Sequence, residues 1–253
     1  MREPHFVVYM KKTAKYLLIT VLSLMLGCFL FGWIYISDYY HADADALEVI
    51  KNPSEGISVR EEKDTYIAFI PEEPTAGLIF YPGGKVQYES YAPLMEACAG
   101  KGILTVLVHV PANLAILDRN AADGYEEMFP EITDWYIGGH SLGGVAAAMY
   151  LEDRADEFKG VVFLAAYPTV DLSETDLKAL SLYGSEDGVL NLEKYEASKR
   201  NLPADFKEAV IEGGCHAYFG SYGRQKGDGE PKITSREQIN ETAELIGRFA
   251  ADA

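Results

Sequence analysis

Cysteine is scarce in this chain, with 3 residues among 253. A small scaffold held together by several disulfides is therefore excluded, because such scaffolds need many cysteines that pair. Cys28 lies inside an apolar run, so only Cys98 and Cys215 remain as partners, and their spacing leaves open whether they pair. No group of cysteines and histidines has the spacing of a metal site, and we expect no bound metal.

Positive charge is also in short supply. Lys and Arg number 22 against 39 Asp and Glu, which gives a formal net charge of −17 at pH 7. A protein this acidic repels phosphate backbones and anionic lipid surfaces, so we expect no nucleic-acid partner. The acidic side chains are expected mainly to keep the protein soluble.

Charge of either sign is missing from residues 16–36, which form an almost wholly apolar run. Such a run is long enough to cross a bilayer as one helix. Lysines precede it and acidic residues follow it, which predicts a cytoplasmic basic lead over 1–15, a transmembrane anchor over 16–36 and an extracytoplasmic location for the rest. We therefore expect a single-pass protein of the cell membrane. A cleaved signal peptide and lipid attachment at Cys28 are the alternatives.

Beyond the anchor, residues 37–56 are polar and acidic and predict a linker with a single helical turn. Residues 57–253 predict one domain. Its first two strands, 57–62 and 66–70, alternate apolar and polar residues, as half-exposed antiparallel strands at a sheet edge do.

The rest of this domain alternates strands with helices. Apolar runs predict buried strands at 76–81, 103–110, 161–166 and 179–183, besides the one that reaches Gly139, and a last strand is expected at 206–211. Helical spacing is found at 88–101, 114–128 and 192–200, and Thr234 to Glu237 form a capping box that opens a last helix. This order predicts an α/β domain with a mostly parallel sheet and helices on both faces.

The chain is organised around Gly139-His140-Ser141-Leu142-Gly143. An apolar run precedes this G-x-S-x-G pattern and an alanine-rich helical pattern follows it, which is typical of a nucleophile elbow. In such an elbow a tight turn from strand to helix exposes the serine hydroxyl, and glycines are needed where a Cβ would not fit. We expect Ser141 to be a nucleophile.

A serine nucleophile needs a base, which an acid in turn orients. In folds with such an elbow the order along the chain is serine, acid, histidine. His216 is the only histidine after Ser141, and it comes just after the last predicted strand. Asp187 lies in a glycine-flanked turn after the strand before it and is the expected acid. Glu186 and Asp171 are alternatives, and an ordinary turn aspartate is another reading of Asp187.

The oxyanion that forms during acyl transfer needs two backbone N–H groups. One is expected from Leu142, the residue after the nucleophile, and the other from the loop after the strand at 76–81. That loop reads Pro82-Gly83-Gly84-Lys85, and we expect the N–H of Gly84 or Lys85 to be the second donor. A plain type II turn around Pro82-Gly83 would account for the glycines almost as well.

Residues 57–252 resemble the small bacterial α/β-hydrolases of the dienelactone-hydrolase-like branch. The similarity is carried by Tyr81-Pro82-Gly83-Gly84, the elbow, Gly184-Ser185-Glu186-Asp187 and Gly214-Cys215-His216, with the segment 216–228 beyond them. The resemblance implies a Ser-Asp-His hydrolase that cleaves an ester or a related acyl bond of a small molecule without a cofactor. Dienelactone hydrolases themselves have a cysteine nucleophile, whereas this chain has Ser141, so their substrate is not carried over.

Many lipases and esterases insert a helical lid after the sixth strand. Residues 166–177 leave too little room for one, so we expect a fairly open site with no large lid. The loop 218–231 contains Tyr218 and Arg224, which we expect to contact substrate through an anionic group. An ordinary solvated loop is the alternative reading.

Two functions from different classes fit this sequence. The first is an esterase-type serine hydrolase, and a thioesterase or peptidase would use the same three residues. The second is an inactive membrane-tethered binding protein built on the same fold.

Overall fold

The structure, a computed structural model, describes residues 5–252, and the side chains from residue 15 onward. The chain divides into two compact units, Met1–Asp38 and Tyr39–Ala253. Residues 1–4 of the predicted basic lead lie outside the described residues.

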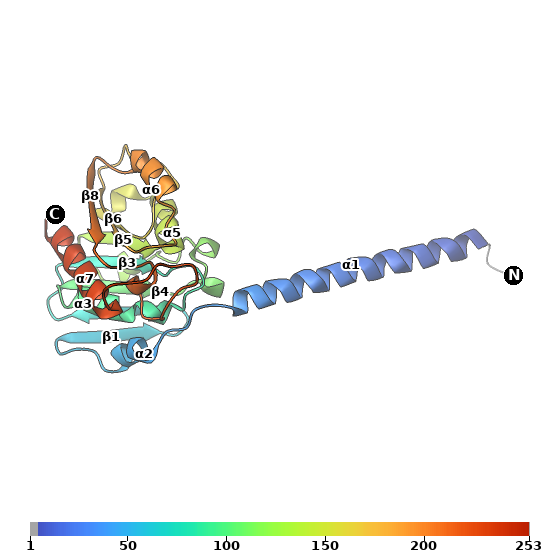
Figure 1. Cartoon of the computed structure of the whole chain (residues 1–253), viewed down its shortest axis with the longest axis horizontal. Coiled ribbons are helices and arrows are strands. Elements are labelled where there is room, and N and C mark those ends of the chain that lie inside the picture. Colours follow the sequence, from blue (N-terminus) through green and yellow to red (C-terminus); the bar gives the residue numbers. More distant parts are fainter. Residues whose placement is uncertain (1–4, 253) are drawn as a thin grey trace. The chain divides into compact units, whose positions relative to one another are not determined.

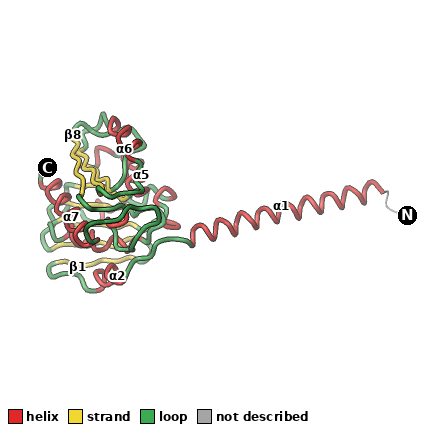
Figure 2. The backbone as a smooth tube through the Cα atoms, in the orientation of Figure 1, coloured by secondary structure: helices red, strands yellow, loops and turns green. Residues whose placement is uncertain are grey.

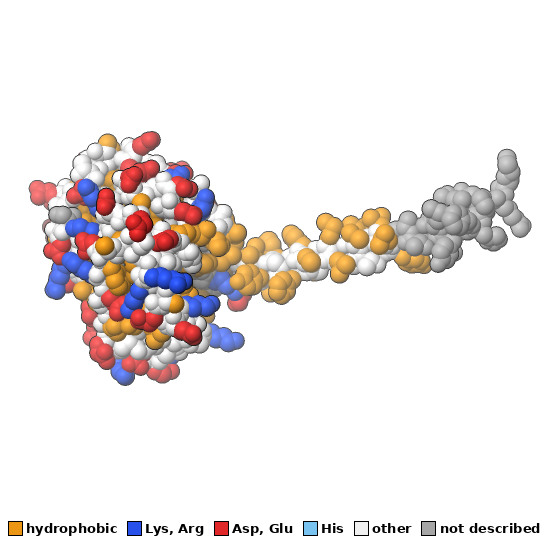
Figure 3. Space-filling view, turned by 90° about the horizontal axis from the view of Figure 1, so that it is seen from above, with side chains coloured by type: hydrophobic (Ala, Val, Ile, Leu, Met, Phe, Trp, Pro, Cys, Tyr) orange, Lys and Arg blue, Asp and Glu red, His pale blue; other side chains and the backbone are white. Residues whose placement is uncertain are grey.

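The first unit is a single helix, α1 (His5–Ser37) (Figures 1 and 2). Its segment Lys15–Ser37 has 23 residues and contains an 18-residue window with a mean hydropathy of 2.4, none of which is buried. Hydrophobic side chains cover this segment on the side seen in Figure 3. At 1.5 Å per residue it is about 35 Å long, compared with about 30 Å for the hydrocarbon core of a bilayer. By length and composition, α1 can cross a membrane where the sequence predicts an anchor.

The second unit is built on an eight-stranded sheet with the order β1-β2-β4-β3-β5-β6-β7-β8. Its strands are β1 (Ile57–Glu62), β2 (Tyr66–Pro71), β3 (Ala76–Tyr81), β4 (Ile103–Val108), β5 (Trp135–His140), β6 (Gly160–Leu164), β7 (Lys178–Gly184) and β8 (Asp205–Ile211). Strand β2 pairs antiparallel with β1 and β4, and all other pairs are parallel. This confirms the mostly parallel sheet with an antiparallel edge.

Two hydrophobic clusters cover the faces of this sheet. Because side chains alternate along a strand, Leu78 and Phe80 of β3 enter one cluster, whereas Ile79 and Tyr81 enter the other. The first cluster includes residues of α3 (Ala92–Ala99) and α7 (Ser235–Ala251), which lie side by side in Figure 1, and the second includes residues of α5 (Leu142–Leu151). The predicted three-layer arrangement is confirmed.

The helix predicted over 114–128 is mostly wrong. Only α4 (Tyr125–Met128) is helical, and short 3₁₀ turns and bends precede it. The buried hydroxyl of Tyr81 accepts a hydrogen bond from the Ala122 N–H at 3.1 Å and donates one to the Arg119 carbonyl. These backbone groups are thereby taken out of a helical ladder, and Gly124, with φ of 86°, sets the start of α4.

The predicted linker over 37–56 is also corrected, because the chain joins the compact unit from Tyr39 onward. Tyr40 forms a parallel bridge with Val86. The helix α2 (Ala44–Lys51) begins at Asp43, whose side chain accepts a hydrogen bond from the Ala46 N–H at 3.0 Å. Three apolar side chains at helical spacing pack this helix against the domain: Ala46, Val49 and Ile50. The sequence analysis missed them because acidic residues dominate the composition of this segment.

The capping box at the start of α7 gives a test of the fold. Glu237 N–H donates to the Thr234 hydroxyl at 3.2 Å, and Thr234 N–H donates to the Glu237 carboxylate at 2.7 Å. We expect Thr234→Ala to lower the free energy of unfolding by about 1 kcal/mol and the melting temperature by about 2–4 °C. Thr234→Ser keeps the hydroxyl and is the control. A Thr234→Ala protein that melts with wild type would show that the box contributes nothing.

Candidate active site

Residues with strained backbone lie together beyond the carboxyl ends of four strands. Four neighbouring strands, β4, β3, β5 and β6, are each followed within a few residues by a non-glycine residue with positive φ: Asn113 (54°), Lys85 (60°), Ser141 (52°) and Ala165 (47°). Such residues cost about 1–3 kcal/mol each and collect at functional sites. In open α/β sheets, ligands bind beyond the carboxyl ends of the strands, which is where these residues lie.

Ser141 stands at the turn from β5 into α5, with φ of 52° and ψ of −117°. The turn is so tight that a Cβ on Gly139 would come within 2.4 Å of the Gly143 carbonyl carbon. The Ser141 N–H donates to the Leu164 carbonyl of β6 at 2.9 Å, which fixes the turn against the neighbouring strand. Ser141 itself is half-buried. The predicted strand–turn–helix geometry is thus present at the predicted serine.

The loops after β7 and β8 bring Asp187 and His216 together. His216 Nδ1 lies 2.9 Å from Asp187 Oδ2, and the two side chains are 2% and 1% exposed. The other carboxylate oxygen, Oδ1, accepts hydrogen bonds from the N–H groups of Val189 and Leu190, both at 2.8 Å. The carboxylate is therefore fixed on both oxygens, and with Nδ1 donating to it, His216 has Nε2 left to act as an acceptor.

His216 also packs against the elbow. Its ring centroid lies 4.5 Å from that of His140, the residue before Ser141. Burial, and then the nearby His216, lower the pKa of His140 well below its ordinary value, so His140 is a neutral neighbour. Its Nδ1 lies 2.7 Å from the Tyr91 hydroxyl, which also accepts a hydrogen bond from the Gly83 N–H at 3.0 Å. Tyr91 thus joins the loop after β3 to the elbow.

Asp228 is a residue that the sequence analysis did not assign a role. Its carboxylate accepts hydrogen bonds of 2.9–3.1 Å from four backbone N–H groups, those of Gly188, His216, Ala217 and Gly229. Burial alone would raise the pKa of Asp228, but these hydrogen bonds outweigh it and lower the pKa. Asp228 thereby ties the loop of Asp187 to the loop of His216. An aspartate between two glycines, Gly227 and Gly229, was the available signal.

The two candidate oxyanion donors in the loop after β3, Gly84 and Lys85, differ in whether their N–H groups are already hydrogen-bonded. A Cβ on Gly84 would come 2.9 Å from Leu142 Cδ2, so Gly84 lies against the residue that follows the serine. The Gly84 N–H has no hydrogen-bond partner among the described residues. The Lys85 N–H, in contrast, donates to the Asn113 carbonyl at 2.7 Å. Lys85 is therefore removed as a candidate donor. The hydrogen-bonded turn in this loop runs from Gly83 to Val86, whose N–H donates to the Gly83 carbonyl at 3.2 Å, and not around Pro82-Gly83 as in the alternative reading.

The two residues expected to contact substrate are placed differently. Tyr218 is half-buried in the 3₁₀ turn that follows His216. Arg224 is exposed and pairs with Glu230 at 2.5 Å and with the Gly229 carbonyl at 3.3 Å. Its guanidinium is engaged within its own loop, so the structure gives no support for an anion site there. No helix forms over residues 165–177, all of which are described, in agreement with the absence of a large lid.

The cysteines do not compete for the role of nucleophile. Cys28, Cys98 and Cys215 are all free, so the pair left open by the sequence is not formed. Burial raises the pKa of the Cys98 and Cys215 thiols to about 12, and both are protonated at neutral pH. No metal-binding group of His, Cys, Asp and Glu is found in the described part of the chain.

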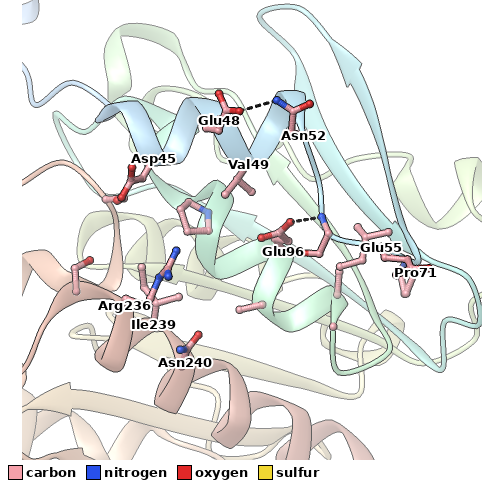
Figure 4. Close-up of a pocket in the computed structure, with 18 of the residues that line it drawn as sticks. Asp45, Glu48, Val49, Asn52, Glu55, Pro71, Glu96, Arg236, Ile239 and Asn240 are labelled. Atoms are coloured by element: carbon pink, nitrogen blue, oxygen red, sulfur yellow. Dashed lines mark hydrogen bonds between the residues drawn. The ribbon is translucent and has the colours of Figure 1, made fainter.

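A cavity of about 990 Å³ lies between α2, α3 and the start of α7 (Figure 4). Carboxylates dominate its charged lining, which includes Asp45, Glu48 and Glu96, with Arg236 facing them from α7. Ser141, Asp187 and His216 do not line it. This hollow is therefore separate from the site assembled at the carboxyl edge of the sheet.

Residues 77–240 match the model of a family described as "Alpha/beta hydrolase family". No curated protein sequence matches the chain. Among solved structures, a predicted CIB-like hydrolase from Thermoplasma acidophilum has a TM-score of 0.54 at 14% identity, with 76% of this chain and 100% of that chain covered.

Two more solved structures are similar. Est1E from Butyrivibrio proteoclasticus has a TM-score of 0.55 at 16% identity, with 79% of this chain and 100% of that one covered. MGS-MChE2, an alpha/beta hydrolase enzyme from the metagenome of sediments of the Mar Chica lagoon in Morocco, has a TM-score of 0.55 at 14% identity, over 77% of this chain and 98% of that one. At such low identities the similarity shows a shared fold alone.

The role of Asp228 predicts how stability changes with pH. Its pKa is lowered in the fold, so its carboxylate stabilises the protein above the unfolded-state pKa of about 3.9, and this contribution is lost as the pH falls through the folded-state pKa. We expect Asp228→Asn to melt earlier than wild type at pH 7 and to lose less further stability between about pH 5 and 3. Asp153→Asn, at an exposed position, is the control for thermal melts. If the melting temperatures of Asp228→Asn and wild type fall equally steeply between about pH 5 and 3, this role is ruled out.

Proposed function

The chain belongs to the alpha/beta hydrolase family, and from this premise we propose that it is a serine hydrolase that cleaves an ester or related acyl bond. Ser141 is the nucleophile, His216 the base and Asp187 the acid that orients the base. The observation that carries the proposal is the buried 2.9 Å hydrogen bond between His216 Nδ1 and Asp187 Oδ2, on the two loops where base and acid are expected.

In the first step, Ser141 Oγ attacks the carbonyl carbon of the substrate, and its proton passes to His216 Nε2. The imidazolium that forms is stabilised by the Asp187 carboxylate, whose orientation is held by the N–H groups of Val189 and Leu190. The tetrahedral intermediate then collapses. His216 gives its proton to the leaving group, and the acyl group remains on Ser141 as an ester.

Negative charge on the carbonyl oxygen is stabilised by two backbone N–H groups in this proposal. Leu142 begins α5, where helix N–H groups have no partner within the helix. Gly84 lies against Leu142 with its N–H unpaired among the described residues. One such donor contributes about 3–4 kcal/mol to lowering the barrier.

In the second step, His216 takes a proton from a water molecule, which attacks the acyl ester of Ser141. Ser141 recovers its proton and the acid product leaves. No metal or cofactor takes part in these steps. Thioesters and peptides would pass through the same two steps, so the residues define the reaction more closely than the leaving group.

We also propose that α1 anchors the domain in the cell membrane as a single pass, with the domain outside the cytoplasm. Its length and hydropathy support the span. The lysines at 11, 12 and 15 and the acidic residues after Ser37 support the direction.

The triad is tested with the full chain in detergent, by labelling with a fluorophosphonate and by hydrolysis of p-nitrophenyl esters of increasing chain length. We expect labelling of wild type at Ser141 and none of Ser141→Ala. His216→Ala and Asp187→Asn should lose hydrolysis by on the order of 10⁴-fold. Ser54→Ala, at an exposed serine, is the matched control. A folded wild type that neither labels nor hydrolyses any ester would contradict the proposal and favour the binding-protein reading.

The anchor is tested in intact bacterial cells that express the chain with a C-terminal tag. We expect the protein in the membrane fraction after an alkaline carbonate wash, because about 20 apolar residues hold a helix in the bilayer. Protease added outside the cytoplasmic membrane should remove the tagged domain, whereas a cytoplasmic marker stays intact. A soluble chain that begins near residue 37 would instead indicate a cleaved signal peptide.

A further inference from the structure

The segment Tyr40–Asp43 follows α1 by only two residues, yet it is hydrogen-bonded to two loops of the candidate site. We call this segment the strap. It lies outside residues 77–240, the part that matches the family.

The first contact of the strap is with the loop after β3. Tyr40 N–H donates to the Lys85 carbonyl at 2.8 Å, and Gln87 N–H donates to the Tyr40 carbonyl at 2.9 Å. Further along, the Ala42 N–H donates to the Gln87 side chain at 3.1 Å. The strap thus adds a short parallel pairing to the loop that carries Gly84.

The second contact is with the loop that follows His216. Lys226 N–H donates to the Tyr40 hydroxyl at 3.0 Å, and the rings of Tyr40 and Tyr222 lie 5.6 Å apart. Asp43 N–H donates to the Ser221 carbonyl at 3.0 Å, and the Ser221 hydroxyl donates to the Asp43 carboxylate at 2.7 Å. One short segment therefore holds both loops at once.

The backbone of Lys85 links the strap to the candidate oxyanion donor, Gly84. Its φ of 60° is strained for a residue with a side chain. Strain of this kind persists only where the surroundings fix the residue, and here Asn113 holds the N–H of Lys85 while Tyr40 holds its carbonyl. The Gly84 N–H shares a peptide plane with the Gly83 carbonyl, which accepts a hydrogen bond from the Val86 N–H at 3.2 Å. Tyr40 is paired with Val86 in the parallel bridge and holds the Lys85 carbonyl, so the strap restrains the turn that sets the direction of the Gly84 N–H.

We propose that Tyr40 is a positioning residue, which acts through its backbone to aim the Gly84 N–H at the oxyanion. The inference rests on the proposed function, since it needs an oxyanion to stabilise. Activity then depends on the segment that directly follows the membrane helix. A displaced oxyanion donor weakens the transition state more than the bound substrate, so loss of the strap lowers kcat and leaves KM nearly unchanged.

The test compares three variants of the full chain in detergent. Tyr40→Pro removes the N–H that holds Lys85, and we expect kcat to fall by about 10- to 100-fold while KM stays within about threefold of wild type. Tyr40→Phe keeps the N–H and the ring and should restore kcat to within about threefold. Tyr39→Pro, one residue outside the strap, is the matched control with kcat close to wild type.

The outcomes separate this inference from the proposed function. If wild type hydrolyses esters and Tyr40→Pro is equally active, the proposed positioning role of Tyr40 is overturned. A Tyr40→Pro variant that changes KM but not kcat would overturn it as well. An inactive, unlabelled wild type would overturn the proposed function instead. If Tyr40→Pro fails to fold, the double variant Gln87→Ala/Ser221→Ala removes the side-chain hydrogen bonds that hold Ala42 and Asp43, which leaves the backbone pairing of Tyr40 with fewer supports. We expect it to lose kcat by about 3- to 10-fold with KM unchanged, and an unchanged kcat would overturn the strap.

Discussion

The geometry of the site depends on the close approach of three backbone segments at the elbow: the end of β3, the end of β5 and the start of α5. Ser141 turns with φ of 52°, and the turn closes only because Gly139 and Gly143 lack side chains. A Cβ on Gly143 would also come 2.3 Å from the carbonyl oxygen of Tyr81, at the end of β3. The end of β3, the end of β5 and the start of α5 are therefore fixed together. For this reason the loop after β3 emerges beside Leu142, and Gly84 lies against that residue.

Two carboxylates fix the loops after β7 and β8, which carry Asp187 and His216. In a chain with 39 acidic residues, most acidic side chains lie on the surface, but Asp187 and Asp228 turn inward and accept hydrogen bonds from backbone N–H groups. Charge-assisted bonds to N–H groups are stronger than neutral ones. Asp187 orients one side chain, whereas Asp228 joins two loops. Most acidic residues of this chain lie on the surface, whereas these two hold parts of the fold in place. Asp187 accepts two backbone N–H bonds and Asp228 accepts four.

The sequence predicted those parts of the molecule that depend on local pattern. The strands 57–62 and 76–81 have the predicted bounds, because apolar or alternating runs end at turn residues. The choice of His216 as the base used chain order alone and stays a prediction, while the structure places its Nδ1 2.9 Å from Asp187 Oδ2. The helix predicted over 114–128 failed because the Tyr81 hydroxyl, some 40 positions away, bonds to its backbone. The engagement of Lys85 by Asn113 and Tyr40 also depends on distant residues, and no periodicity reports such bonds.

A site without a helical lid needs another source of rigidity. Where a lid is present, closing it can exclude water and complete the constellation of catalytic groups. Here residues 165–177 form no helix. An oxyanion donor stabilises charge only if it is already aimed when the charge develops. In the proposed mechanism, the hydrogen bonds of the strap hold the loop of Gly84, and those of Asp228 hold the loops of Asp187 and His216, without a moving part. The strap begins two residues after α1, so the chain that leaves the helix is itself part of this frame. A change in the segment that links α1 to the domain is therefore expected to alter the proposed site.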